Sequence, residues 1–251
     1  MNNAARTKLV FKSLILFCLF AAVIHLGRLS RENQALLAEV EQLEAELGRM
    51  EITDSRRIHL VEVKNPDVPP ELGKQLDFIC QFRCYIPPGY DANEFSGSGF
   101  VTEKGIYHSG SYGSAWRSSQ KEPVQEIMTV SISKEEDYWR IFYSYGGNSF
   151  TQSWRLSRPD LTPDQLVIQK LVSSETGAKS FTTDMILPLL KIYDPNTAVE
   201  KEIDGKKQTV YQGCITVLYP KNRDPDFQML LNGVIPPQFD PSMLATGLSN
   251  D

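Results

Sequence analysis

The clearest structural signal lies in residues 78–86, which read Phe-Ile-Cys-Gln-Phe-Arg-Cys-Tyr-Ile. Every second side chain belongs to one face of an extended chain, and that face consists of Phe78, Cys80, Phe82, Cys84 and Ile86. This alternation is typical of a half-buried β-strand, and Pro87-Pro88-Gly89 ends it. The segment therefore indicates a sheet domain whose core holds both cysteines.

Similar signals predict further strands over residues 99–102, 105–108, 126–133, 138–145, 149–156 and 209–219. Turns are expected at Gly146-Gly147-Asn148 and at Asp204-Gly205. A helix is expected over residues 162–172, with Thr162 as its cap and Pro163 at its first position. A weaker helix is expected over residues 183–190, and the tail from residue 232 is expected to be loop.

These elements predict a mainly β region over residues 55–251. Many short strands separated by turns favour a single β-sandwich or jelly-roll-like domain with one or two helices. Two small β-domains divided near Pro159 are the alternative.

The charge of the 251-residue chain is unevenly distributed. Residues 1–31 carry five basic residues and no acidic one, which leaves 21 basic against 31 acidic residues in the remainder, a net charge of −10. A net charge this negative outside residues 1–31 argues against binding to a nucleic-acid backbone. The overall content of 41% hydrophobic and 23% charged residues is that of an ordinary globular protein.

Residues 9–27 are predicted to form a transmembrane signal-anchor after a short tail, residues 1–8. The stretch is apolar apart from Lys12, Ser13 and His25, and 18 residues from Leu9 to Leu26 span roughly 27 Å as a helix. The basic residues before it place the N-terminus in the cytoplasm and the main domain outside it. A cleaved signal peptide is the rival interpretation, but Ala21 and Ala22 are adjacent and lack the spacing of a cleavage site.

Residues 28–54 are predicted to form a short parallel coiled coil. Heptad a and d positions, starting at Leu26, continue through the oligomerisation residues Leu29, Asn33, Leu36, Val40, Leu43, Leu47 and Met50. A single asparagine at an a position favours a two-stranded coil in fixed register, because paired amides satisfy each other there.

The flanking g and e positions complicate a homodimer, because they would place Glu39 against Glu44 and Glu46 against Glu51 of the second chain. Two partners therefore remain open: a second copy, confined to the same membrane, or another anchored helix with basic e and g positions. A third possibility is a single amphipathic helix that packs on its own outer domain.

This order of short basic tail, single span, coil and outer domain resembles that of bacterial envelope proteins with one span. The septum-formation initiator family and the rod-shape-determining periplasmic scaffold family share it. The resemblance is architectural, and it assigns no role to any residue of this chain.

The sequence carries no motif for a cofactor, a metal or a catalytic nucleophile. Its three histidines, at positions 25, 59 and 108, lack ligands at metal-binding spacing. Residues 96–101, Ser-Gly-Ser-Gly-Phe-Val, are faintly similar to the start of trypsin-like envelope proteases, but the nucleophile loop of that family is missing. A disulfide from Cys214 to one of the two strand cysteines is an open possibility outside the cytoplasm.

Aromatic residues are concentrated between positions 107 and 154. Exposed rings stack on sugars or on partner proteins, which makes Tyr112, Trp116 and Trp154 candidate ligand-binding residues. The alternative is that these strands simply use aromatic residues in their core, as the alternation of Trp139, Ile141, Tyr143 and Tyr145 indicates.

Together these features predict a non-catalytic envelope protein with a protein-binding outer domain. A module that binds carbohydrate or cell wall is the second hypothesis. A hydrolase that uses a pair of carboxylates is the third.

Overall fold

The computed structural model describes residues 20, 24–36, 39–40, 50–64, 66, 76–155, 158 and 160–237. The chain divides into two compact units, residues 1–43 and residues 44–251. The second unit is mainly β and contains two six-stranded sheets, all of whose neighbouring strands are antiparallel.

The first sheet has the strand order β7-β6-β5-β2-β1-β9. Its strands are β1 (Ile58–Glu62), β2 (Phe78–Ile86), β5 (Val124–Lys134), β6 (Tyr138–Tyr145), β7 (Asn148–Arg155) and β9 (Lys179–Phe181).

The second sheet has the order β4-β3-β12-β10-β8, and β11 also pairs with β12. Its strands are β3 (Ala92–Thr102), β4 (His108–Arg117), β8 (Val167–Lys170), β10 (Leu187–Tyr193), β11 (Val199–Ile203) and β12 (Lys206–Pro220). The remaining elements are the short helices η1 (Pro163–Gln165), η2 (Pro195–Thr197) and η3 (Lys221–Arg223) and the helix α3 (Asp224–Leu231).

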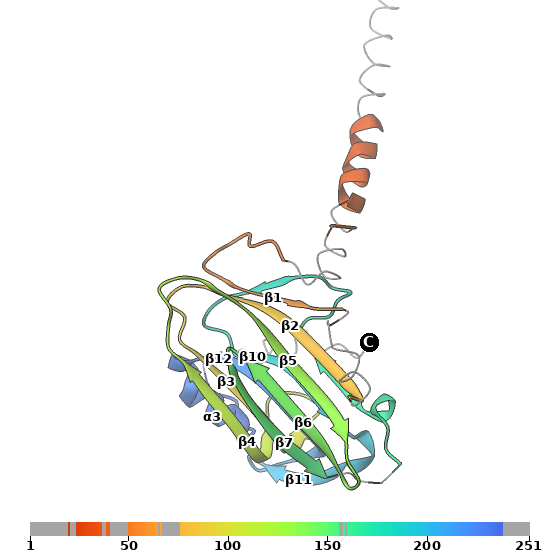
Figure 1. Cartoon of the computed structure of the whole chain (residues 1–251), viewed down its shortest axis with the longest axis vertical. Coiled ribbons are helices and arrows are strands. Elements are labelled where there is room, and N and C mark those ends of the chain that lie inside the picture. The colour runs from red at the N-terminus through yellow and green to blue at the C-terminus, as the bar shows by residue number, and fades with distance from the viewer. Residues whose placement is uncertain are drawn as a thin grey trace, which may run out of the picture. The chain divides into compact units, whose positions relative to one another are not determined.

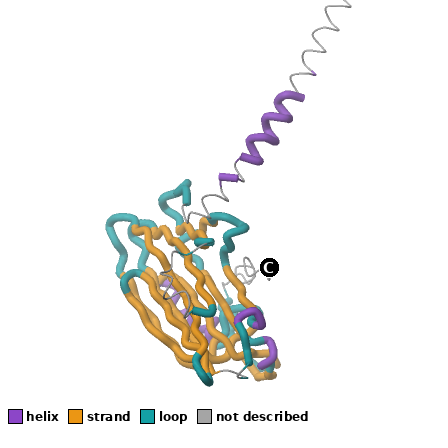
Figure 2. Tube along the Cα trace, turned by 45° about the vertical axis from the view of Figure 1, so that its right-hand side comes forward, coloured by secondary structure: helices purple, strands orange, loops and turns teal. Residues whose placement is uncertain are grey.

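The sheets pack as a sandwich around the larger hydrophobic core, which includes Phe82 and Tyr143 from the first sheet and Leu190 and Leu218 from the second (Figure 1). A smaller core lies between the second sheet and α3, where Phe227 contacts Phe95 and Tyr219. Figure 2 shows that strands make up most of this unit, with loops and turns towards its two ends.

The strand predicted over residues 78–86 is confirmed with the same bounds as β2. Cys80, Phe82 and Cys84 are buried in the larger core, while Gln81 and Arg83 between them are partly exposed. The three described cysteines are free, so no disulfide joins Cys214 to either of the others. The hairpin at Asp204-Gly205 is also confirmed, with positive φ at both residues between β11 and β12.

The two helices expected after residue 160 are wrong. The predicted cap at Thr162 begins only the single turn η1, in which the Thr162 N–H donates to Gln165 Oε1 at 3.2 Å. The apolar residues that follow form β8, and the second predicted helix is replaced by β10, which is buried throughout. Pairing between these two strands gives their apolar side chains a place in the sandwich that an isolated helix does not offer.

Both sheets take strands from either side of residue 159. The first sheet contains β9, and the second sheet combines β3 and β4 with β8, β10 and β12. The sandwich is therefore one structure, and the alternative of two small β-domains divided near Pro159 does not describe the strand pairing.

In the first unit, residues 24–36 are helical, and the Arg28 guanidinium pairs with the Glu32 carboxylate at 2.8 Å one turn later. Within the described part of the chain, no helix combines the length and the hydropathy needed to cross a membrane. Most of the predicted span, residues 9–27, lies outside the described residues. Residues 50–54 are not helical, so the predicted end of the coil at residue 54 is too late.

Candidate ligand-binding site

The strand β4 forms one edge of the second sheet and carries two exposed aromatic side chains. Tyr112 is 64% exposed and Trp116 is 49% exposed. Side chains alternate along a strand, so these two residues share the outer face. The Tyr112 ring stacks on Phe95 at 5.3 Å between ring centroids, and the Trp116 ring meets the edge of Tyr219 at 5.9 Å.

A cavity of about 420 Å³ adjoins Trp116. It is lined by Trp116, Arg117, Gln120, Val124, Glu126, Gly146 and Asn148. These residues come from the end of β4, the loop after it, the start of β5 and the turn between β6 and β7. The cavity therefore lies where one end of the sandwich brings both sheets together.

The polar wall of this cavity is an ion pair between Arg117 of the second sheet and Glu126 of the first. The guanidinium also lies 4.8 Å from the centroid of the Tyr145 ring, a cation–π contact. Burial on its own would lower the pKa of Arg117, but the hydrogen bond to Glu126 and the nearby Tyr145, Glu126 and Glu94 together outweigh it, so the pKa is raised and the group stays charged. Gly146 has a positive φ of 57°, and the guanidinium occupies the space that a β-carbon would need at this position.

A second carboxylate, Glu94 on β3, lies deeper between the sheets and does not line the cavity. Burial raises the pKa of Glu94 from 4.5 to about 7; Arg117 opposes this shift and Glu126 adds to it. The cavity thus presents one carboxylate, which is already paired with arginine. This arrangement suits the binding of a polar ligand better than acid–base hydrolysis, which needs two carboxylates that both reach the substrate.

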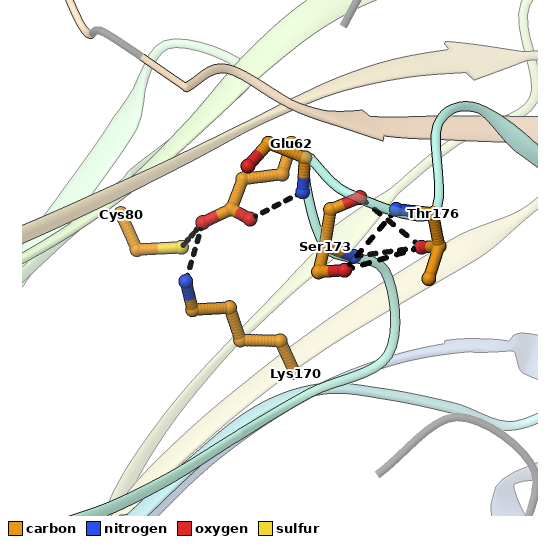
Figure 3. Close-up of polar contacts among 6 residues, drawn as sticks. Glu62, Cys80, Lys170, Ser173 and Thr176 are labelled. Atoms are coloured by element: carbon orange, nitrogen blue, oxygen red, sulfur yellow. Dashed lines mark hydrogen bonds and ion pairs between the residues drawn. The ribbon is translucent and has the colours of Figure 1, made fainter. Parts of the chain in front are cut away.

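A separate polar cluster surrounds Glu62 at the end of β1 (Figure 3). The Glu62 carboxylate accepts hydrogen bonds from Lys170 Nζ at 2.6 Å, from the Ser174 N–H at 2.8 Å and from Cys80 Sγ at 3.6 Å. Burial, together with the nearby Glu62 charge, raises the pKa of the Cys80 thiol, so the thiol stays protonated. The cluster fastens β1 of one sheet to β8 of the other, and its cysteine is structural rather than reactive.

The structure keeps two of the three predicted ligand-binding residues on one surface. Trp154 differs, because it is 4% exposed and lies opposite Trp139 in the core. It offers no face to a ligand, since β7 turns it inward. In the part of the chain that the structure describes, no group of three or more His, Cys, Asp or Glu side chains could hold a metal ion.

Arg117 and Glu126 are not among the site residues predicted from the sequence. Both are charged residues at positions that strand alternation assigns to the inner face. Arg117 stands two residues after Ala115, and Glu126 stands two residues before Met128. A charge on the buried face of each of two strands is a signal for such a pair. Neither sequence position indicates, however, that the two strands meet.

Of the predicted oligomerisation residues, Leu29, Asn33, Leu36 and Val40 are exposed on helical residues of the first unit. Met50 is partly buried and lies outside any helix, while Leu43 and Leu47 fall outside the described residues.

Searches with protein-family models, curated proteins and solved structures found no match to this chain.

Proposed function

We propose that this protein is a membrane-anchored scaffold that dimerises through its N-terminal helix and binds another protein with its outer β-domain. The observation that carries the proposal is an apolar stripe on the helical residues 24–36 and 39–40. Leu26, Leu29, Leu36 and Val40 are between 47% and 66% exposed. A continuous apolar stripe on a helix is stable in water when a second helix covers it.

The a and d positions favour a parallel two-stranded coil, for which a second copy is the proposed partner. The stripe combines two a and two d positions, and Asn33 occupies the a position between them. The Asn33 side chain is exposed in the single chain, whereas two such amides hydrogen-bond each other in a parallel two-stranded coil. The anchor predicted over residues 9–27 supports this arrangement, because two chains in one membrane have a raised effective concentration.

The protein-binding role of the outer domain is supported by the edge strand β4. Among the described strands only β3 pairs with it, so its other side offers free backbone donors and acceptors. Residues 109–116 of this strand contain no charged residue and no proline, which are the usual guards of an exposed edge. Extended segments of partner proteins add to edges of this kind.

Cysteine cross-linking of the full chain in membranes tests the dimer. The background variant is Cys18→Ser, since the other three cysteines are buried. Leu29→Cys lies at a d position, and Arg31→Cys, two residues later at an f position, is the matched control. We expect oxidation to convert Leu29→Cys, but not Arg31→Cys, into a species of twice the chain mass on a non-reducing gel.

Two results would contradict a homodimer. Equal cross-linking of both variants would mean random collision in the membrane. A conjugate of Leu29→Cys with a different protein would mean that the partner is another anchored helix with basic e and g positions.

A further inference from the structure

The cavity beside Trp116 combines an exposed aromatic ring with polar side chains. The indole is half exposed, and its position is set by the Tyr219 ring at 5.9 Å and by Lys221 Nζ at 6.0 Å from the indole centroid. An aromatic face carries partial negative charge and attracts the C–H groups on the apolar face of a pyranose ring.

The polar groups that line the cavity are planar and in part held in place. Gln120 Nε2 donates to the Ser118 carbonyl oxygen at 3.2 Å, which orients the Gln120 amide. The Glu126 carboxylate is held by Arg117, and Asn148 contributes a second amide at the rim. Planar amide groups can each engage two neighbouring hydroxyl groups.

The charge of the cavity selects the ligand further. Its lining residues include one cation and one anion, Arg117 and Glu126, and these neutralise each other. A charged ligand would compete with this pair, whereas a neutral ligand leaves it intact. The volume, about 420 Å³, lies within the range of about 300–1,000 Å³ typical of small-molecule sites.

We propose that this cavity binds a neutral oligosaccharide, with one pyranose ring stacked on Trp116 and its hydroxyl groups bonded to the side-chain amides of Gln120 and Asn148. The inference is independent of the dimer, because every residue involved lies within the second unit.

Fluorescence quenching can test the proposal selectively. Trp139 and Trp154 are buried, so among the three tryptophans acrylamide reaches mainly Trp116. The full chain is held in a zwitterionic detergent without a sugar headgroup, and the probes are chitotetraose, cellotetraose and maltotetraose. We expect at least one probe to protect Trp116 from acrylamide in a saturable manner.

Calorimetric titration with the protective probe then locates the site. Trp116→Ala is expected to weaken binding by about tenfold or more, and Asn148→Ala by roughly two- to tenfold. Tyr112→Ala is the matched control, because Tyr112 is exposed on the same face of the same strand but does not line the cavity. It should leave the affinity unchanged, and Trp116→Phe should retain part of it.

Three results would overturn the proposal. One is the absence of protection by all three probes at millimolar concentration. Another is binding that survives Trp116→Ala. The third is a loss of affinity in Tyr112→Ala as large as that in Trp116→Ala, which would place the ligand along β4 instead of in the cavity.

Discussion

Glu94 illustrates how a single buried group can make the stability of the whole sandwich depend on pH. The side chain lies on the inner face of β3 and is 2% exposed. Burial raises the pKa of Glu94 to about 7, so the folded protein favours the protonated, neutral form of this side chain. An acid with a raised pKa in the folded state binds more protons there than in the unfolded chain.

We therefore expect the free energy of unfolding to fall as pH rises from about 4.5 to about 7, with a loss of about 3 kcal/mol from Glu94 alone. Glu94→Gln keeps the shape of the side chain and cannot ionise, so it should remove this contribution and be more stable than the natural chain at pH 8. Urea unfolding of both proteins across this pH range measures the difference.

The two proteins are compared with each other because His108 also contributes to the pH dependence. Burial lowers the pKa of His108, which makes stability rise with pH and partly offsets Glu94. A difference between the variant and the natural chain that stays constant from pH 4.5 to 8 would contradict the assignment to Glu94.

At the scale of elements, the edge of the sandwich that includes β1 and β8 is closed by a salt bridge. Lys170 Nζ lies 2.6 Å from Glu62 Oε1, with the Glu62 side chain 9% exposed. Breaking such a buried pair from one side leaves a charge without its partner, which costs more than the pair itself contributes.

Lys170→Met is expected to lower the free energy of unfolding by about 3 kcal/mol, because it leaves the Glu62 carboxylate buried without its cationic partner. Lys207→Met is the matched control, since Lys207 and Glu200 are both mostly exposed and 4.0 Å apart; its effect should stay below about 0.5 kcal/mol. The double variant Glu62→Gln with Lys170→Met should recover part of the loss. Equal effects of the two lysine substitutions in urea unfolding would show that the pair does not fasten the sheets.

At the scale of the whole molecule, the scaffold proposal makes Asn33 the residue that limits assembly to two chains. Leucine at this a position would extend the apolar seam and remove the amide that favours a two-stranded coil. We expect light scattering of the full chain in detergent to show dimers for the natural protein and a shift to higher oligomers for Asn33→Leu. A monomer in both cases would mean that the acidic g and e positions prevail over the seam.

Much of the sandwich followed from local sequence. The alternation in β2 and β6, including the inward-facing Trp139, Ile141, Tyr143 and Tyr145, predicted which side chains are buried, and the structure confirms it. Turn residues at Asp204-Gly205 predicted a hairpin that is present. Such signals succeed because strand periodicity and left-handed turn conformations depend on neighbouring residues alone.

The helix α3 and the strands β8 and β10 show where local signals fail. Pro225 and two acidic residues mark the start of α3, a local signal for a helix that was not among those predicted. The apolar residues of β8 and β10 fit a helix or a strand equally well, and only pairing with neighbouring strands decides between them.

The sequence by itself determined the mainly β class of the second unit, the buried face of its clearest strands, the core positions of Cys80 and Cys84, and the exposed stripe of a helix that begins before residue 29. The tertiary structure decided which aromatic residues reach the surface, separating Trp116 from Trp154, and it brought Arg117 and Glu126 together from different sheets. The physical reason is that alternation places a side chain on a face of its own strand, whereas packing decides whether that face is covered and which distant residue lies opposite.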